Sequence, residues 1–286
     1  MSEVTWHATP TLRRPLFIAG FAGLFDIAET ATAALTHLAS RGRPETIASI
    51  DPEHFFNFTR HRPHVKLGED DVRRIRWPAN EVAVLDDPAG VHDLVLLAGL
   101  EPDIRWRSFA EAVLDVARRL NCELVVTVGA MADAVPHTRQ PQVIGSTTNE
   151  RLARSLGLSP PRYQGPTGVV GVLHDLLDRR KVPAVSLRVP VPHYAAGAEH
   201  PLSTQALLRH LEHVTGVPTG HATLDDEVAR QRRRLDRAVA ADNDAGQYVA
   251  ALEQRYDERV VDELPSGDDL AAELERFLRD QDDDGG

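Results

Sequence analysis

Short apolar runs alternate with helical patterns along the first three quarters of the chain. Each run is unbroken, which is typical of strands buried on both faces of a parallel sheet. Between the runs, apolar residues recur three and four positions apart, as on helices that pack against a sheet. The pattern predicts an α/β fold, a three-layer α/β/α sandwich around a largely parallel sheet. The expected strands are 15–21, 46–50, 81–85, 94–98, 124–128 and 184–189, and the expected helices lie within 25–40, 109–120, 169–177 and 207–214.

Two regions depart from this alternation. Residues 51–78 are rich in aromatic, histidine and arginine side chains, and they predict strand pairs and loops at the edge of the sheet. Later in the chain the strand pattern stops, and apolar residues keep helical spacing on both sides of the polar stretch 242–246, which predicts an antiparallel helical hairpin. We therefore divide the chain into an α/β/α domain (12–220), a C-terminal helical hairpin (221–264) and a short helix with an acidic tail (265–286).

Two of the expected strands lead to a Pro-His pair. The fifth strand leads to His137, Thr138 and Arg139, and the sixth leads to His193 and Tyr194. Because the carboxyl ends of parallel strands meet at one edge of a sheet, we expect these side chains to share one pocket. A histidine there would transfer a proton, and the arginine would hold an anionic group. In an alternative that stays open, each histidine only pins its loop to a nearby carbonyl or to a second subunit.

A further polar segment follows the strand expected at 94–98. Glu101, Arg105 and Arg107 come between this strand and the next helix, so they would reach the same rim and line the candidate pocket. The two arginines would serve equally well as partners of acids across an oligomer interface.

Gly20 and Gly23 lie between the first strand and the first helix. Backbone N–H groups at the start of a helix can receive an anion, so the two glycines are a candidate anion-binding turn. They lack the spacing of the dinucleotide-binding and P-loop motifs. We therefore favour the structural explanation, in which glycine is needed for a tight turn.

Composition narrows the classes of partner. The formal net charge is −11, which repels phosphate backbones and argues against nucleic acid as a partner. No apolar stretch approaches the ~20 residues that a membrane-spanning helix requires, so we expect no membrane association. The single cysteine, Cys122, excludes an intrachain disulfide and fits a reducing cytoplasm. The 13 histidines never form a zinc-binding motif, and we expect no metal and no cofactor.

A series of short motifs follows one another along the chain: Asp26-Ile-Ala-Glu-Thr-Ala31, Asp51-Pro-Glu-His-Phe-Phe-Asn-Phe58, Arg62-Pro63, Trp77-Pro78, Glu101-Pro-Asp-Ile-Arg-Trp-Arg107, Val135-Pro-His-Thr-Arg139, Tyr163-Gln-Gly-Pro-Thr-Gly168, Val191-Pro-His-Tyr194 and Tyr248-Val-Ala-Ala-Leu-Glu253. In this order they resemble the proteasome assembly chaperone 2 family, in its actinobacterial branch, over roughly residues 15–264. Where that branch usually carries Gly-Trp-Asn-Asp, this chain has Gly23-Leu-Phe-Asp26.

The resemblance implies a phosphorylase/hydrolase-like α/β/α fold and homo-oligomers, often trimers. It also implies a proteasome-related protein partner, since eukaryotic and archaeal relatives assist proteasome assembly. It supplies no set of catalytic residues that this chain would inherit.

Two functions follow. The first is a non-catalytic, homo-oligomeric protein-binding or assembly factor, which the resemblance and the lack of a complete catalytic motif favour. The alternative is an enzyme or ligand-binding protein of the nucleoside phosphorylase or hydrolase type that uses the candidate pocket. The client protein, the ligand and the number of subunits stay open at this point.

Overall fold

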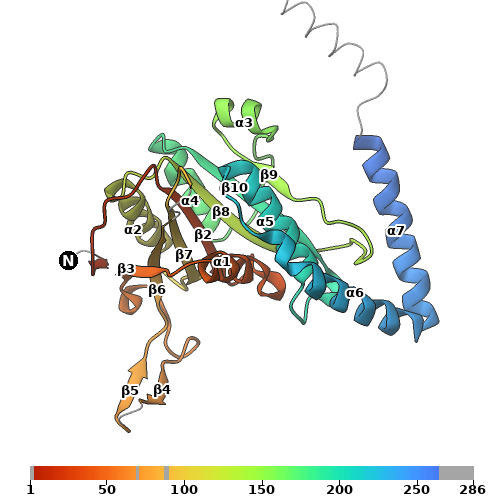
Figure 1. Ribbon diagram of the computed structural model, residues 1–286, viewed down its shortest axis with the longest axis horizontal. Coiled ribbons are helices and arrows are strands. Elements are labelled where there is room, and N and C mark those ends of the chain that lie inside the picture. The colour runs from red at the N-terminus through yellow and green to blue at the C-terminus, as the bar shows by residue number, and fades with distance from the viewer. Residues whose placement is uncertain (1–2, 69–70, 87–89, 264–286) are drawn as a thin grey trace, which may run out of the picture.

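The computed structural model describes residues 3–68, 71–86 and 90–263 of the chain. These residues form a mixed α/β fold on one large sheet (Figure 1). The strands are β1 (Val4–Trp6), β2 (Leu16–Ala22), β3 (Glu45–Ile50), β4 (His64–Leu67), β5 (Arg73–Arg76), β6 (Asn80–Leu85), β7 (Leu94–Leu100), β8 (Leu124–Asp133), β9 (Ile144–Ser146) and β10 (Ala184–Pro192). The helices are α1 (Thr30–Ser40), α2 (Trp106–Arg119), α3 (Glu150–Leu156), α4 (Val169–Arg179), α5 (Pro201–Thr215), α6 (Asp225–Ala240) and α7 (Asn243–Glu263).

The large sheet has the strand order β1-β3-β6-β7-β2-β8-β10-β9. Its four middle strands, β7, β2, β8 and β10, are parallel, and the outer strands pair antiparallel. The prediction of a largely parallel sheet is thus correct only for the middle. β6 and β7 run antiparallel because residues 86–93 between them are too few for the crossover that parallel neighbours require.

Helices cover both faces of this sheet (Figure 1). α2 and α4 pack on one face and α1 and α5 on the other, which gives two apolar cores. Phe17 and Phe109 belong to the first core, and Ile18 and Leu211 to the second. Because each fully buried side chain of this kind contributes roughly 1.5–3 kcal/mol, the two cores hold the strand ends in fixed positions.

The first helix begins later than predicted. Ala28 and Glu29 adopt left-handed backbone angles, with φ of 57° and 52°, so regular α-helix starts only at Thr30. The buried Asp26 carboxylate accepts the backbone N–H of Ala31 at 2.7 Å. An acid in this position satisfies an unpaired donor at the helix start and thereby caps α1.

β4 and β5 form a separate two-stranded sheet, which we call the arm. The arm projects away from the body at the bottom of Figure 1, whereas the sequence prediction placed these strands at the edge of the main sheet. Every residue of both strands is exposed. Their basic side chains resist burial in a core, and this explains why the strands do not join the large sheet.

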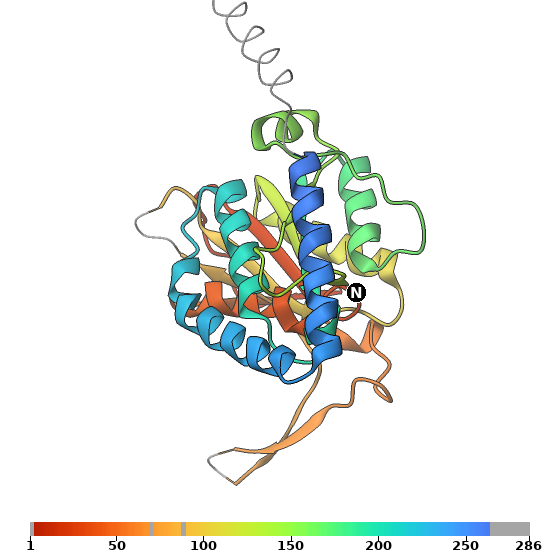
Figure 2. The ribbon, with the colours of Figure 1, turned by 90° about the vertical axis from the view of Figure 1, so that its right-hand side faces the viewer.

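α6 and α7 follow the body as a helical pair joined at residues 241–242. Both views show the two helices diverging from this turn, so they form an open corner rather than the antiparallel hairpin that the sequence predicted (Figures 1 and 2). Figure 2 shows α7 upright across one side of the body. Val249, Leu252 and Tyr256 are the buried residues by which α7 is anchored. The predicted final helix and acidic tail (265–286) lie outside the described residues.

Candidate functional site

The two Pro-His loops meet beyond the carboxyl ends of β8 and β10. The Tyr194 hydroxyl accepts the backbone N–H of His137 at 2.8 Å and lies 2.7 Å from Nδ1 of the same residue. His137 itself is buried, with 2% of its surface exposed. The hydroxyl accepts one hydrogen bond from the backbone and keeps its own proton to donate, so one tyrosine side chain bonds to both the backbone and the ring of His137.

α6 and α7 hold the first loop from outside. His137 Nε2 lies 3.1 Å from an Asp236 carboxylate oxygen on α6, and the Thr138 hydroxyl donates to Glu253 on α7. The Tyr256 hydroxyl donates to the carbonyl of the loop residue that follows Arg139. The loop is therefore bonded to helices more than 90 residues further along the chain.

Arg139 is paired on the same surface. Its Nε and Nη2 donate to the two carboxylate oxygens of Asp257, both at 2.8 Å, and its Nη1 lies 3.3 Å from Glu253. The hydrogen bond from Arg139 lowers the pKa of the Asp257 carboxyl below its usual value. The guanidinium that the sequence marked as an anion clamp thus already holds two anions from its own chain.

The second loop is bonded in the same manner. His193 Nδ1 lies 3.1 Å from the carbonyl of Asp133, and its Nε2 lies 3.1 Å from the Tyr248 hydroxyl on α7. Burial raises the pKa of the Tyr194 hydroxyl, and the hydrogen bond from the His137 backbone acts in the opposite sense. The structure therefore brings together five of the candidate residues, His137, Thr138, Arg139, His193 and Tyr194, in a cluster that we call the clamp.

Glu101 lies elsewhere and joins two other segments. Its carboxylate accepts the backbone N–H of Leu24 and that of Val169, each at 3.1 Å. It thereby ties the turn after β2 to the first residue of α4. A Cβ added at Gly23 would lie only 2.6 Å from this carboxylate, so the glycine permits the close approach.

Arg105 and Arg107 also lie away from the clamp. Arg105 precedes α2 and donates to Glu3 at 3.0 Å, while its guanidinium lies 5.8 Å from the centre of the Phe55 ring. Arg107 is exposed on the first turn of α2. The structure does not bring these two arginines together with the Pro-His loops.

The candidate anion turn is occupied by groups of the chain itself. Gly20 is buried in β2, where an added Cβ would lie 3.0 Å from Leu35 and 3.1 Å from Val128. The N–H that follows Gly23 already bonds to the Glu101 carboxylate. Anion binding at Gly20 and Gly23 stays a prediction.

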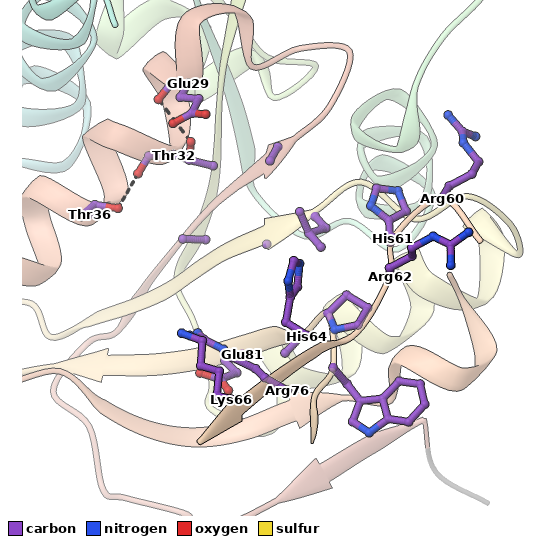
Figure 3. Close-up of a pocket in the computed structure, with 17 residues that line it drawn as sticks. Glu29, Thr32, Thr36, Arg60, His61, Arg62, His64, Lys66, Arg76 and Glu81 are labelled. Atoms are coloured by element: carbon purple, nitrogen blue, oxygen red, sulfur yellow. Dashed lines mark hydrogen bonds between the residues drawn. The ribbon is translucent and has the colours of Figure 1, made fainter. Parts of the chain in front are cut away.

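Two of the cavities outside the clamp bear on function, and other residues line them. One, of about 870 Å³, is a groove between the arm and α1, and Figure 3 shows its basic side chains. The other, of about 370 Å³, lies between β8, β10 and α4 and is lined by Ser186 and Arg188 of β10. Sequence reasoning passed over both residues, although a signal was present. Ser186 and Arg188 alternate with the apolar residues Val185, Leu187 and Val189, which indicates a stretch of strand with one polar face.

Among residues 3–68, 71–86 and 90–263, no group of three or more His, Cys, Asp or Glu side chains is placed to hold a metal ion. Within the same ranges, no helix combines the length and the apolar character needed to cross a membrane.

Comparisons with known proteins place the chain in a family. The model of the PAC2 family matches residues 20–239. A PAC2 family protein from Streptomyces avermitilis is 37% identical, with a TM-score of 0.77, over 82% of this chain and 99% of its own. The Mycobacterium tuberculosis proteasome-assembly chaperone homologue Rv2125 is 34% identical, with a TM-score of 0.74 and the same coverage. The fold thus defines a mixed α/β protein, and the chain belongs to the PAC2 family.

A more distant similarity concerns the fold alone. PbaB from Pyrococcus furiosus, described as an archaeal proteasome activator, is 18% identical with a TM-score of 0.64, over 83% of this chain and 99% of its own. A search of curated proteins gives no match.

Proposed function

We propose that the chain is a non-catalytic, homo-oligomeric protein-binding or assembly factor, and that the arm is its principal contact surface. The observation that carries the proposal is the arm itself. A two-stranded hairpin on its own is at best marginally stable in water and exposes unpaired strand edges. Such an element gains stability when a partner covers it.

The arm has two unlike faces. Val65 pairs with Ile75 in the strand register, and because side chains alternate, Leu67 lies on the same face. These three side chains are 53%, 58% and 67% exposed, respectively for Val65, Ile75 and Leu67. Exposed apolar residues grouped on one face are typical of protein interaction sites.

The opposite face of the arm is basic and borders the groove. His64, Lys66 and Arg76 lie along one side of the groove, while Glu29 and Thr32 lie on the side formed by the start of α1 (Figure 3). Arginine and lysine side chains in a groove of about 870 Å³ suit an acidic partner segment. The proposed partner therefore presents an apolar surface to one face of the arm and carboxylates to the other.

The comparisons support a proteasome-related partner. The solved structure of Rv2125, which is 34% identical, is described as a proteasome-assembly chaperone homologue. We extend this role to the present chain as part of the proposal. We further propose a phosphorylase/hydrolase-like sandwich, a cytoplasmic location and a homotrimer, in which the arm of one subunit covers apolar surface of the next.

The clamp favours this function over the nucleoside phosphorylase or hydrolase alternative. A catalytic histidine and an anion-binding arginine must face a substrate. His137 is buried between Tyr194 and Asp236, and Arg139 is paired with Asp257. Their hydrogen bonds support a structural role in holding α6 and α7 on the body.

Sedimentation analysis of the full chain tests the proposal. The wild-type protein should sediment with the mass of three chains, and the double substitution Val65→Asp with Ile75→Asp should shift it toward the monomer. Val91→Asp serves as a matched control, since Val91 is 61% exposed but lies away from the arm. Monomeric wild-type protein at tens of micromolar would contradict the homo-oligomer.

A second measurement addresses the protein partner. Immobilised wild-type chain should retain proteasome subunits from extract of the source cells, and the double arm variant should lose them while the Val91→Asp control keeps them. Equal retention by both variants would remove the arm from the proposal, and a lack of proteasome subunits on the wild-type chain would contradict the proposed partner.

A further inference from the structure

The cavity of about 370 Å³ beside α4 has a row of hydroxyl groups as its floor. Thr127 of β8, Ser186 of β10 and Ser146 of β9 occupy paired positions across three neighbouring strands. Side chains that are direct cross-strand neighbours have their Cβ atoms roughly 5 Å apart, so the three hydroxyls form a continuous row. Within the described part of the chain, the hydroxyls of Ser146 and Ser186 make no hydrogen bond. The two serine hydroxyls of the row are thus available to a ligand.

Arg188 stands at the end of this row with an unpaired charge. It follows Ser186 by two positions, so it projects from the same face of β10. Among the residues that the structure describes, its guanidinium has no ion pair, and its buried Nε has no hydrogen-bond partner. Burial lowers the pKa of this guanidinium. A partly buried cation without a partner is costly, and an anion bound beside it offsets the cost.

A glycine lies beside this arginine on the neighbouring strand. Gly129 is the cross-strand neighbour of Arg188 on β8. A Cβ placed there would lie 3.7 Å from Arg188 Cγ and 3.2 Å from the Phe25 carbonyl. The missing side chain therefore allows the Phe25 backbone to approach β8, and Phe25 and Arg188 both line the cavity.

His174 of α4 completes the inner wall without adding positive charge. Its Nε2 lies 2.7 Å from the Thr127 hydroxyl. Burial, and secondly the charge on Arg188, lowers the pKa of His174 to about 4, so the ring is neutral near pH 7. Arg188 is then the positive charge at the inner end of the cavity.

Carboxylates lie at the outer end. Asp175 is 61% exposed and forms an ion pair with Arg179 one turn further along α4. Asp178 accepts a hydrogen bond from the Thr148 hydroxyl at 2.9 Å. These acids repel a second negative charge and favour hydrogen-bond donors on the part of a ligand that reaches the mouth.

We propose that this cavity binds a small molecule with an anionic head group, a carboxylate or a phosphate, that pairs with Arg188, and with hydroxyl groups that bond to the row of Thr127, Ser186 and Ser146. The volume is within the range of ~300–1,000 Å³ that small-molecule sites occupy. The inference does not depend on the protein-binding function proposed above, because no residue of the arm contributes to the cavity.

Isothermal titration of the full chain tests this site with four defined probes: inorganic phosphate, glycolate, glycerol 3-phosphate and uncharged glycerol. At least one of the three anions should bind saturably, and glycerol should not. Binding of glycolate alone would assign a carboxylate ligand, and binding of phosphate or its ester would assign a phosphate ligand. Because a charge-assisted hydrogen bond is lost, Arg188→Met should weaken binding at least ~10-fold.

The matched control is Arg139→Met, which removes a paired arginine outside the cavity and should leave the affinity unchanged within about twofold. Circular dichroism verifies that each variant folds. The smaller substitution Ser186→Ala provides a second test of the site. Ser186→Ala should weaken the hydroxyl-bearing probes several-fold, since it deletes one hydrogen bond. Failure of all three anions to bind below about 10 mM, or equal affinity in Arg188→Met and the wild-type protein, would overturn the inference.

Discussion

Arg139 lies in the loop after β8 and Arg188 lies within the neighbouring strand β10, yet their surroundings are opposite. Arg139 follows β8 and has both oxygens of Asp257 at 2.8 Å, with Glu253 beside it. Arg188 lies within β10, lines a cavity and has no ion pair among the described residues. Arg139, which is already ion-paired, is the arginine that the sequence motif of histidine and arginine between prolines marks. Arg188, which has no ion pair among the described residues, lies in a strand without any such motif.

The difference lies in α7. Its carboxylates are far away in sequence and arrive at Arg139 only through the tertiary fold. Among residues 3–68, 71–86 and 90–263, no acid forms an ion pair with Arg188, and in the same cavity His174 and Thr127 bond to each other. An arginine is therefore a candidate ligand-binding group when the folded protein supplies no acidic partner for it, whatever sequence motif surrounds it.

The largest expected effect is on the clamp side of this comparison. Leu252 is a fully buried residue of α7. Leu252→Ala should therefore lower the free energy of unfolding by about 2–5 kcal/mol. Urea denaturation measures this loss. Hydrogen exchange should also show faster exchange in the loop that contains His137, because α7 holds that loop. Gln254→Ala, on the exposed face of the same helix, should stay within about 0.5 kcal/mol of the wild type, and equal losses in both variants would contradict the clamp.

The next effect belongs to the cavity side and depends on pH. The pKa of His174 falls from 6.5 in the unfolded chain to about 4 in the folded protein, so the unfolded state takes up the proton first. Stability is then complete above pH 6.5 and is lost as the pH falls toward 4, by up to about 3 kcal/mol. Unfolding by urea at pH 7, 5.5 and 4 should show a shallower decline in His174→Gln. His200, whose pKa burial also lowers to about 4, accounts for a remaining slope. Parallel curves for variant and wild type would contradict the assignment.

A direct comparison of the two arginines should give opposite signs. Arg188→Met removes an unpaired, partly buried charge and should raise the free energy of unfolding of the ligand-free protein by up to about 1 kcal/mol. Arg139→Met removes a paired charge and strands two carboxylates of α7, so it should lower the melting temperature. Calorimetry of both variants and the wild type in the same buffer measures the sign of each change in melting temperature. Destabilisation by Arg188→Met would show that the guanidinium has a partner.

The smallest effect isolates the ion pair of Arg139. Its hydrogen bond lowers the pKa of Asp257 below the ordinary value of 3.8. The contribution of the pair is then present above this pH and disappears as the pH falls through the lowered pKa. Asp257→Asn should reduce the melting temperature slightly at pH 7, and the difference from the wild type should shrink as the pH falls below 3.8. Because the pair is exposed, high salt should also reduce the difference.

The apolar runs and the order of the sequence motifs predict most strands of the large sheet and the family of the protein. They mark the strands β2, β3, β6, β7, β8 and β10, because unbroken apolar runs have few alternatives in a buried sheet. The motif order identifies the PAC2 family. The antiparallel outer strands were missed because strand direction depends on the length of the connections, which the apolar pattern does not report.

The candidate site was less accessible to sequence reasoning. His137 and Tyr194 come together because parallel strands end at one edge, which topology predicts. Their partners Asp236, Glu253 and Asp257 are ordinary acids on amphipathic helices, and nothing local assigns them to a loop a hundred residues away. Pairing of this kind depends on how helices dock, so it required the structure.

Glu101 has a consequence for the cavity, although it does not line it. Its carboxylate bonds to the N–H of Leu24, next to the aromatic wall residue Phe25, and to the N–H of Val169, at the start of the helix that carries His174. One side chain thus joins two segments that contribute residues to the wall of the cavity. Shortening it by one methylene, as in Glu101→Asp, should change the spacing of these two segments and with it the size of ligand that the proposed site accepts.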